Sequence, residues 1–258
     1  LEDSSRRIEM VYWGLFTAGD TASVADATSG LNTTLNIDGL NYNGFGNPLA
    51  AVFDGSANHS LSRSFEYHNV EWNLTSTNRS NDGKQSVQLL IGFRYLKADD
   101  RFKLTVDDVG YSVSDDNHLF GIQIGGLGHW QKNENLTYHA GVKAGLFFNA
   151  IDHRTQILGA AGDAFIEDPA IVNWRDDFNE YSNKNDISFL GQLEFGLDYT
   201  LRDGCKFTAG YRVMGVTGIA FATDQIPASF AEAAMGQSVA ADGSLILHGV
   251  YMGIDWSF

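Results

Sequence analysis

Residues 244–258 read SLILHGVYMGIDWSF, and this C-terminal stretch decides the fold. From His248 to Phe258 the even-numbered positions are mostly apolar, whereas the positions between them are mostly small or polar. A period of two is the pattern of a β-strand. Because the second face carries glycines and the carboxylate of Asp255, the stretch fits a wall with lipid outside and a polar lumen inside. A strand of a soluble sandwich also fits this segment taken alone.

Composition limits the kinds of protein that the chain can be. With 258 residues and 43% hydrophobic residues it is long enough for one all-β barrel. No stretch approaches the roughly 20 apolar residues of a transmembrane helix. A net charge of −15 without clustered Lys or Arg argues against a nucleic-acid partner. The single cysteine, Cys205, excludes an internal disulfide and a cysteine-rich metal site. The chain starts without Met or a signal peptide, so we expect a mature or trimmed product.

The same alternation recurs along the chain and predicts eight long strands. They are expected at 8–16, 65–75, 87–95, 119–130, 136–148, 187–199, 207–213 and 244–258. Short turns at 76–85, 131–134 and 200–204 alternate with long polar connections at 17–63, 97–116, 149–185 and 215–243. The second of these connections contains a short strand pair around Phe102, Leu104 and Val106. Outer-membrane barrels place short turns on the periplasmic side and long loops outside, and this order fits that rule throughout.

Aromatic residues gather near the ends of the expected strands and resemble two membrane girdles. We expect the apolar face of the last strand to serve as the barrel assembly signal, through Met252, Ile254, Trp256 and Phe258.

Several strand motifs resemble a known family. The segments LLIGFRYLKADD, HLFGIQIGG, VKAGLFFN, FLGQLEFGLDYTL and FTAGYRVMGVTGIAFATDQI are similar to strands of the seventh group of the beta-barrel porins of bacterial outer membranes. The similarity covers roughly 65–227, and the first strand fits loosely. The resemblance implies an outer-membrane location and a barrel fold. It brings no catalytic residues, and transport is only the role commonly assigned to such barrels.

Charged residues on the expected inner face are candidates for a lumen network. They are Glu71, Arg94, Lys143, Glu194, Asp198, Lys206, Arg212 and Asp255. An eight-stranded barrel leaves an interior just wide enough for side chains, so opposite charges are expected to pair and plug it. The alternative is a narrow polar pore, which needs water between these groups.

Acidic pairs and histidines are candidates for two further kinds of site. Acidic pairs such as Asp99 with Asp100 and Asp115 with Asp116 can bind divalent cations, but solvated loop charge is the ordinary explanation and the metal question stays open. His118, His153 and His248 stand in no catalytic motif, and His139 fits a lumen hydrogen-bonding role. The sequence therefore predicts neither an enzyme nor a cofactor.

The sequence as a whole predicts a single all-β domain, an eight-stranded antiparallel up-and-down transmembrane β-barrel of the bacterial outer membrane with long extracellular loops. We expect a structural anchor or surface-interaction scaffold whose partners are outer-membrane lipid and, through the loops, envelope or surface proteins. Oligomers are compatible with this reading. The alternatives are a porin-type channel for small ions or solutes and a soluble lipocalin-type barrel, which needs apolar side chains inside.

Overall fold

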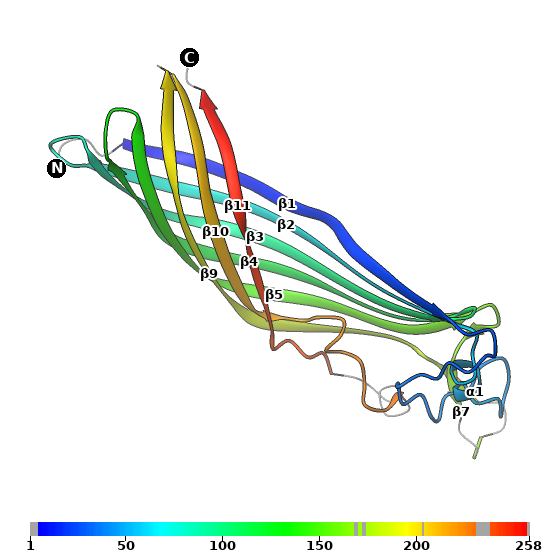
Figure 1. Cartoon of the computed structure of the whole chain (residues 1–258). Helices are drawn as coiled ribbons and strands as arrows, with labels where there is room; N and C mark the ends of the chain where they lie inside the picture. The colour runs from blue at the N-terminus through cyan, green and yellow to red at the C-terminus, as the bar shows by residue number, and fades with distance from the viewer. Residues whose placement is uncertain (1–4, 168–169, 172–173, 203, 231–237, 257–258) are drawn as a thin grey trace.

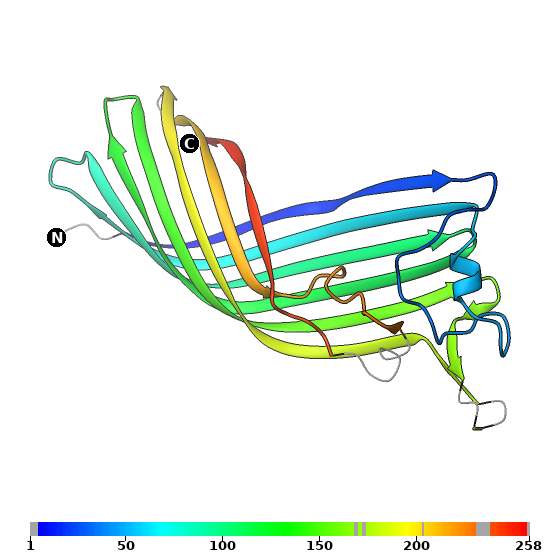
Figure 2. The same cartoon turned by 60° about the horizontal axis from the view of Figure 1, so that its bottom comes forward.

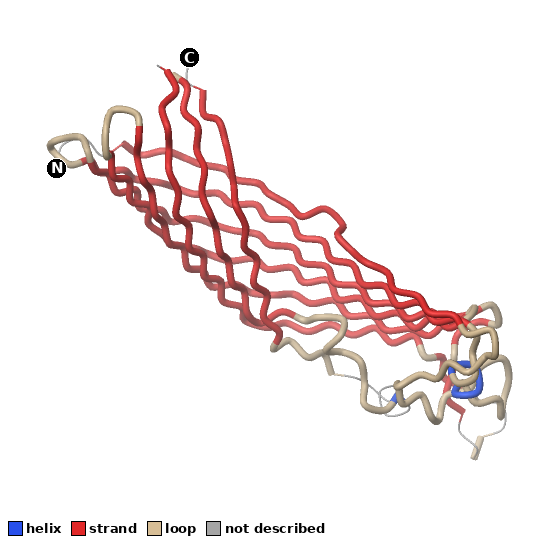
Figure 3. The backbone as a smooth tube through the Cα atoms, in the orientation of Figure 1, coloured by secondary structure: helices blue, strands red, loops and turns tan. Residues whose placement is uncertain are grey.

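The computed structural model describes residues 5–167, 170–171, 174–202, 204–230 and 238–256, which form an all-β protein around one curled antiparallel sheet. Figure 1 and Figure 3 show the long strands running side by side, and Figure 2 shows how the sheet curls into a half-barrel. α1 (Ala50–Phe53) lies beside one end of the sheet (Figure 1). Among the described residues no helix is long and apolar enough to cross a bilayer.

Eight of the described strands have at least 14 residues and lie in the sheet in their order along the chain. They are β1 (Ser5–Ala25), β2 (Asn58–Arg79), β3 (Gln85–Val106), β4 (Val109–Gln131), β5 (Leu136–Gly159), β9 (Asn179–Arg202), β10 (Cys205–Ile219) and β11 (Gly243–Trp256). The short β6 (Gly162–Asp163) extends the sheet beside β5, while β7 (Phe165–Glu167) and β8 (Arg175–Asp177) form a separate pair. Consecutive antiparallel strands need only local connections.

The two ends of the sheet differ. The start of β1, the end of β11 and the short turns after β2, β4 and β9 lie at one end, here called the proximal end (Figure 1). The opposite, distal end carries α1, β7 and the longer connections (Figure 3). The three short turns lie where the sequence predicts them.

The long connections are shorter than the sequence predicts, because the strands continue into them. The short strand pair predicted around Phe102, Leu104 and Val106 is present, but the loop expected around it at 97–116 is wrong: β3 and β4 continue through the whole segment and leave only Asp107 and Asp108 between them. The other three shrink to 26–57, 160–178 and 220–242, the second of which holds β6, β7 and β8. The expectation failed because acidic residues in these segments were read as loop charge, whereas several lie on the outer face of a strand.

Burial divides the molecule into two parts with opposite polarity. We call the described residues of 6–16, 67–96, 119–149, 187–216 and 244–256 the proximal part, and the described residues of 17–66, 97–118, 150–186 and 217–243 the distal part. In the proximal part large apolar side chains point outward and are exposed, for example Leu193 and Phe195 at 60% and 61%, while Glu71 and Arg94 are buried on the inner face. In this part the outer face is therefore apolar, and the inner face carries buried charged residues.

The distal part reverses this arrangement. Alternate residues of β3 and β4, such as Phe102, Val106 and Tyr111, point inward and join a buried apolar cluster with side chains of the connections, Phe53 and Phe230 among them. We call this cluster the distal core. The outer face of the same strands carries Lys97, Asp99, Arg101, Lys103, Ser112, Ser114 and Asp116. This polarity is that of an ordinary water-soluble domain.

The sheet is open in this structure, whereas the sequence predicts a closed barrel. β1 and β11 stand at its two edges, and no ladder between them is found in the described residues. A cavity of about 440 Å³ lies between the edges and is lined by Trp13 and Leu15 from β1 and by Leu247 and Val250 from β11. A bulge between Leu15 and Ala18 also bends β1 at this height. A cavity lined by side chains therefore lies where a backbone ladder was expected.

Candidate functional site

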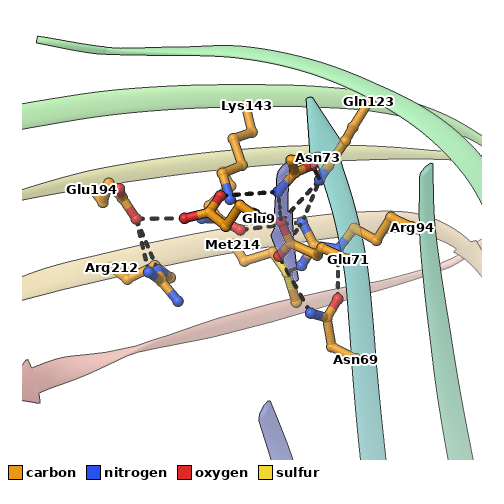
Figure 4. Close-up of polar contacts among 11 residues, drawn as sticks. Glu9, Asn69, Glu71, Asn73, Arg94, Gln123, Lys143, Glu194, Arg212 and Met214 are labelled. Atoms are coloured by element: carbon orange, nitrogen blue, oxygen red, sulfur yellow. Dashed lines mark hydrogen bonds and ion pairs between the residues drawn. The ribbon is translucent and has the colours of Figure 1, made fainter. Parts of the chain in front are cut away.

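The inner face of the proximal part is filled by one polar network centred on Arg94, a fully buried residue of β3 (Figure 4). Its Nε donates to Asn69 Oδ1 at 2.5 Å, and its other nitrogens donate to Gln123 Oε1 at 3.3 Å, Gln192 Oε1 at 3.2 Å and Met214 Sδ at 3.0 Å. Gln192 and Met214 lie on β9 and β10, on the far side of the curled sheet. One side chain therefore bridges the lumen from wall to wall.

Glu71 of β2 balances the charge of Arg94 and is 1% exposed. Its Oε1 lies 3.6 Å from the Arg94 guanidinium, and its Oε2 lies 2.8 Å from Lys143 Nζ on β5. Gln123 Nε2 donates to the same Oε2 at 2.8 Å. A buried carboxylate is tolerated when charges and donors surround it in this way. The predicted pairing of lumen charges is thus present around Glu71.

A second ion pair lies beside the first one. Arg212 of β10 contacts Glu194 Oε2 of β9 through two nitrogens, at 3.0 and 2.9 Å, and Gln192 Nε2 donates to the same oxygen at 3.5 Å (Figure 4). Gln192 therefore links this pair to Arg94. Only about 100 Å³ of cavity lies among these groups, which is space for a few waters at about 30 Å³ each.

An apolar layer closes the lumen on the distal side of the network. Its buried members come from five adjacent strands and are Leu96, Leu119, Phe147, Leu190, Met214, Val216 and Ile219. Met214 belongs to both assemblies, because its sulfur accepts from Arg94. The polar network and the apolar layer therefore form one continuous plug.

Three of the predicted lumen residues, Asp198, Lys206 and Asp255, lie instead near the proximal mouth. Asp198 of β9 accepts from Thr208 Oγ1 at 2.8 Å and lies 3.3 Å from Lys206 Nζ. Asp255 lies opposite Lys206 across β10 and β11, but it is exposed. The structure thus brings Glu71, Arg94 and Lys143 together, pairs Glu194 with Arg212, pairs Asp198 with Lys206, and leaves Asp255 outside these contacts.

Sequence reasoning missed several residues of the lumen. Gln123 and Gln192 carry no charge, so a search for charged inner-face residues passes over them, although both join the network. His129 was missed as well, and it lies directly opposite His139 on β4 and β5. The signal was present, since the two histidines are equidistant from Glu134 in a predicted tight hairpin, and such residues pair across antiparallel strands.

The acidic pairs of the distal part are divided between the two faces of the sheet. Asp99 lies 2.5 Å from Lys97 on the outer face, while Asp100 forms a two-point ion pair with Arg63 on the inner face, at 2.9 and 3.2 Å. Asp115 is fully buried and bonds His153 Nδ1 at 2.8 Å. These carboxylates are engaged by protein groups and do not form one cation site.

Of the predicted assembly signal, Met252, Ile254 and Trp256 lie exposed on the outer face of β11, and Phe258 lies outside the described residues. No family model, curated protein or solved structure matches the chain. The resemblance to beta-barrel porins thus stays a prediction, and a function has to be argued from the residues themselves.

Proposed function

We propose that the chain is an integral outer-membrane protein that anchors a water-exposed platform, its distal part, through a plugged β-barrel in the bilayer. The observation that carries this proposal is the reversal of polarity along the strands. An apolar outer face around a polar interior is stable when hydrocarbon surrounds it, and the opposite arrangement is stable in water. A chain that crosses a bilayer and continues into water needs an apolar outer face in the bilayer and a polar outer face beyond it.

The width of the apolar outer face supports the same proposal. On β9 the outward residues run from Ile187 through Phe189, Leu193 and Phe195 to Leu201, and all are exposed. A membrane strand needs about 9–11 residues, and this stretch is long enough. Exposed Trp130, Tyr138 and Tyr199 near the proximal end fit an aromatic girdle.

The filled lumen favours an anchor over a diffusion channel. Arg94, Glu71 and the apolar layer occupy the interior with direct contacts, and a channel needs a continuous aqueous path between such groups. In this proposal the long strands serve to hold the distal part away from the bilayer, where its polar outer face can meet envelope or surface proteins.

Conductance in planar bilayers tests the anchor against the channel. The purified chain, reconstituted in vesicles whose incorporation is verified by flotation, is expected to give no stable unit current. Recordings of an established porin in the same bilayers serve as the positive control. A reproducible current of aqueous-pore size would overturn the plugged-anchor proposal and favour the channel.

In lipid we further propose that β1 and β11 pair and close the barrel, because hydrocarbon leaves unpaired backbone groups of a sheet edge without partners. Cysteine pairs scanned along 13–15 and 247–250, in a Cys205→Ser background, test this. Adjacent antiparallel strands lie about 4.5–5.5 Å apart, within the range of a disulfide. Oxidation in vesicles is expected to cross-link at least one pair, whereas an Ile8→Cys and Ile246→Cys pair stays reduced. A panel without cross-links contradicts closure.

A further inference from the structure

Two imidazoles and a carboxylate meet at the proximal mouth of the half-barrel. His129 and His139 face each other across β4 and β5, and Asp198 follows on β9, opposite Thr137. His139 Nδ1 lies 3.5 Å from Asp198 Oδ1, and His129 Nδ1 lies 3.7 Å from Asp198 Oδ2. One ligand atom from each of the three residues lies within 4.8 Å of the other two.

His139 provides an independent sign that this cluster is built for a ligand. Its side chain is 5% exposed, and its buried Nδ1 has no hydrogen-bond partner. Its Nε2 lies 2.6 Å from the hydroxyl of Tyr251 on β11. When Nε2 donates its proton to that hydroxyl, Nδ1 directs a lone pair toward Asp198 and His129. A buried acceptor left unpaired is unfavourable, and a bound cation removes that penalty.

We propose that His129, His139 and Asp198 bind a divalent transition-metal ion of the Zn²⁺ class. Tetrahedral Zn²⁺ has bonds of about 2.0–2.2 Å to imidazole and carboxylate, which places neighbouring ligand atoms about 3.3–3.6 Å apart. His139 and His129 approach different oxygens of Asp198, at 3.5 and 3.7 Å, and the three ligand atoms lie within 4.8 Å of one another. The side chains therefore have to draw together by up to about 1 Å around one ion to reach this tetrahedral geometry. Imidazole ligands select such ions over Mg²⁺ and Ca²⁺, which prefer oxygen.

The surroundings of the three ligands suit a metal site. Thr208 Oγ1 donates to Asp198 Oδ1 at 2.8 Å, and with the Tyr251 contact to His139 this supplies the outer hydrogen bonds that orient metal ligands. Gly196 lies opposite His139, and a Cβ there would come within 2.6 Å of His139 Nε2. Glycine at this position therefore leaves space for the ring.

Lys206 is the competing cation, with its Nζ 3.3 Å from Asp198 Oδ2. Its side chain is 39% exposed and lies opposite Asp255 across β10 and β11, so it can exchange one carboxylate for the other when a metal binds. A hollow of about 430 Å³, lined by His129, Asp198 and Lys206 among others, gives ions access from the proximal side. It also offers space for a water as the fourth ligand.

Titration calorimetry of the tag-free, folded chain in detergent micelles tests the proposal, after chelator treatment and with ZnCl₂ as the probe. One equivalent per chain is expected to bind. His139→Ala and Asp198→Asn are expected to abolish binding, and Tyr251→Phe to weaken it by about tenfold, the lower end of the effect of an outer-shell partner. His118→Ala removes a histidine outside the cluster, which lies against Tyr95, and is expected to bind Zn²⁺ as the wild type does.

Cobalt absorption keeps the test decisive if a ligand variant fails to fold. Co²⁺ in the wild-type chain is expected to give the intense visible bands of a four-coordinate site, which excess Zn²⁺ removes. Failure of the wild type to bind either ion, or Zn²⁺ affinity unchanged in both folded ligand variants, overturns the proposal. The conductance measurement does not decide the metal-site proposal. Zn²⁺ binding at the proximal mouth requires neither a plugged lumen nor a conducting one.

Discussion

The proximal and distal parts of the molecule use the same strands in opposite ways. In β3 the inward residue Arg94 belongs to a polar network and the outward Phe93 is exposed, whereas further along the strand Phe102 and Leu104 point inward and Lys103 points outward. Alternation along a strand thus indicates that its two faces differ in polarity. It does not indicate which face is buried, because that depends on what surrounds the sheet. The comparison teaches that one unbroken strand can reverse the polarity of its two faces along its length.

Removing a charge from the polar network of the proximal part should lower the free energy of unfolding more than the other changes described below. Glu71→Ala leaves Arg94 buried without its main counter-charge, and removal of one partner of a buried pair lowers stability by about 3–5 kcal/mol. The free energy of unfolding, measured by urea titration of the chain in lipid vesicles, checks this. Glu134→Ala, in the turn after β4, is the control and should be close to neutral. A loss as small as that of the control would show that the network does not support the fold.

An added charge on the outer face tests whether lipid surrounds the proximal part and water the distal part. Leu193→Arg places a cation in the middle of the apolar outer face of β9, and an arginine facing lipid near the bilayer midplane costs about 2–4 kcal/mol. Thr105→Arg, on the outer face of the distal part, should change stability by no more than about 0.5 kcal/mol. Unfolding of both variants in vesicles compares them. Equal effects at the two positions would contradict a bilayer around the proximal part alone.

A smaller, pH-dependent effect is expected in the distal part. Burial raises the pKa of the Asp115 carboxyl, and the hydrogen bond from His153 opposes this only in part. The folded chain therefore holds this proton more tightly than the unfolded chain, so the carboxyl destabilises the fold at neutral pH and ceases to do so in acid. Asp115→Asn mimics the protonated group at every pH.

The melting temperature of the wild type relative to Asp115→Asn should therefore rise as the pH falls from neutral toward the ordinary range of aspartate. Other carboxylates are common to both proteins and cancel in this difference. Asp108 lies in the exposed turn between β3 and β4, and Asp108→Asn is the control. The melting-temperature difference between the wild type and this variant should not change with pH in this way. A difference that falls on acidification would have the wrong sign for a buried carboxyl.

Much of the sheet could be predicted from the sequence because apolar and polar residues alternate within each strand. The positions of the short turns followed from counting along adjacent strands, and the expectation that opposite inner-face charges pair followed from the same alternation, without naming the partners. The bridge from Arg94 to Gln192 and Met214 could not, because it depends on how far the sheet curls. The strand pair within 97–116 was predicted too short, because the inner Asp100 looks like loop charge until Arg63 is brought beside it.

The up-and-down order of the strands also shapes assembly. Each long strand pairs with the long strand before it in the chain, so the contacts between strands are local in sequence, and local contacts favour fast folding. Only the joining of β1 to β11 would bring together residues from the two extremes of the sequence. In a closed barrel, that junction would be the one strand pairing between segments distant in the sequence.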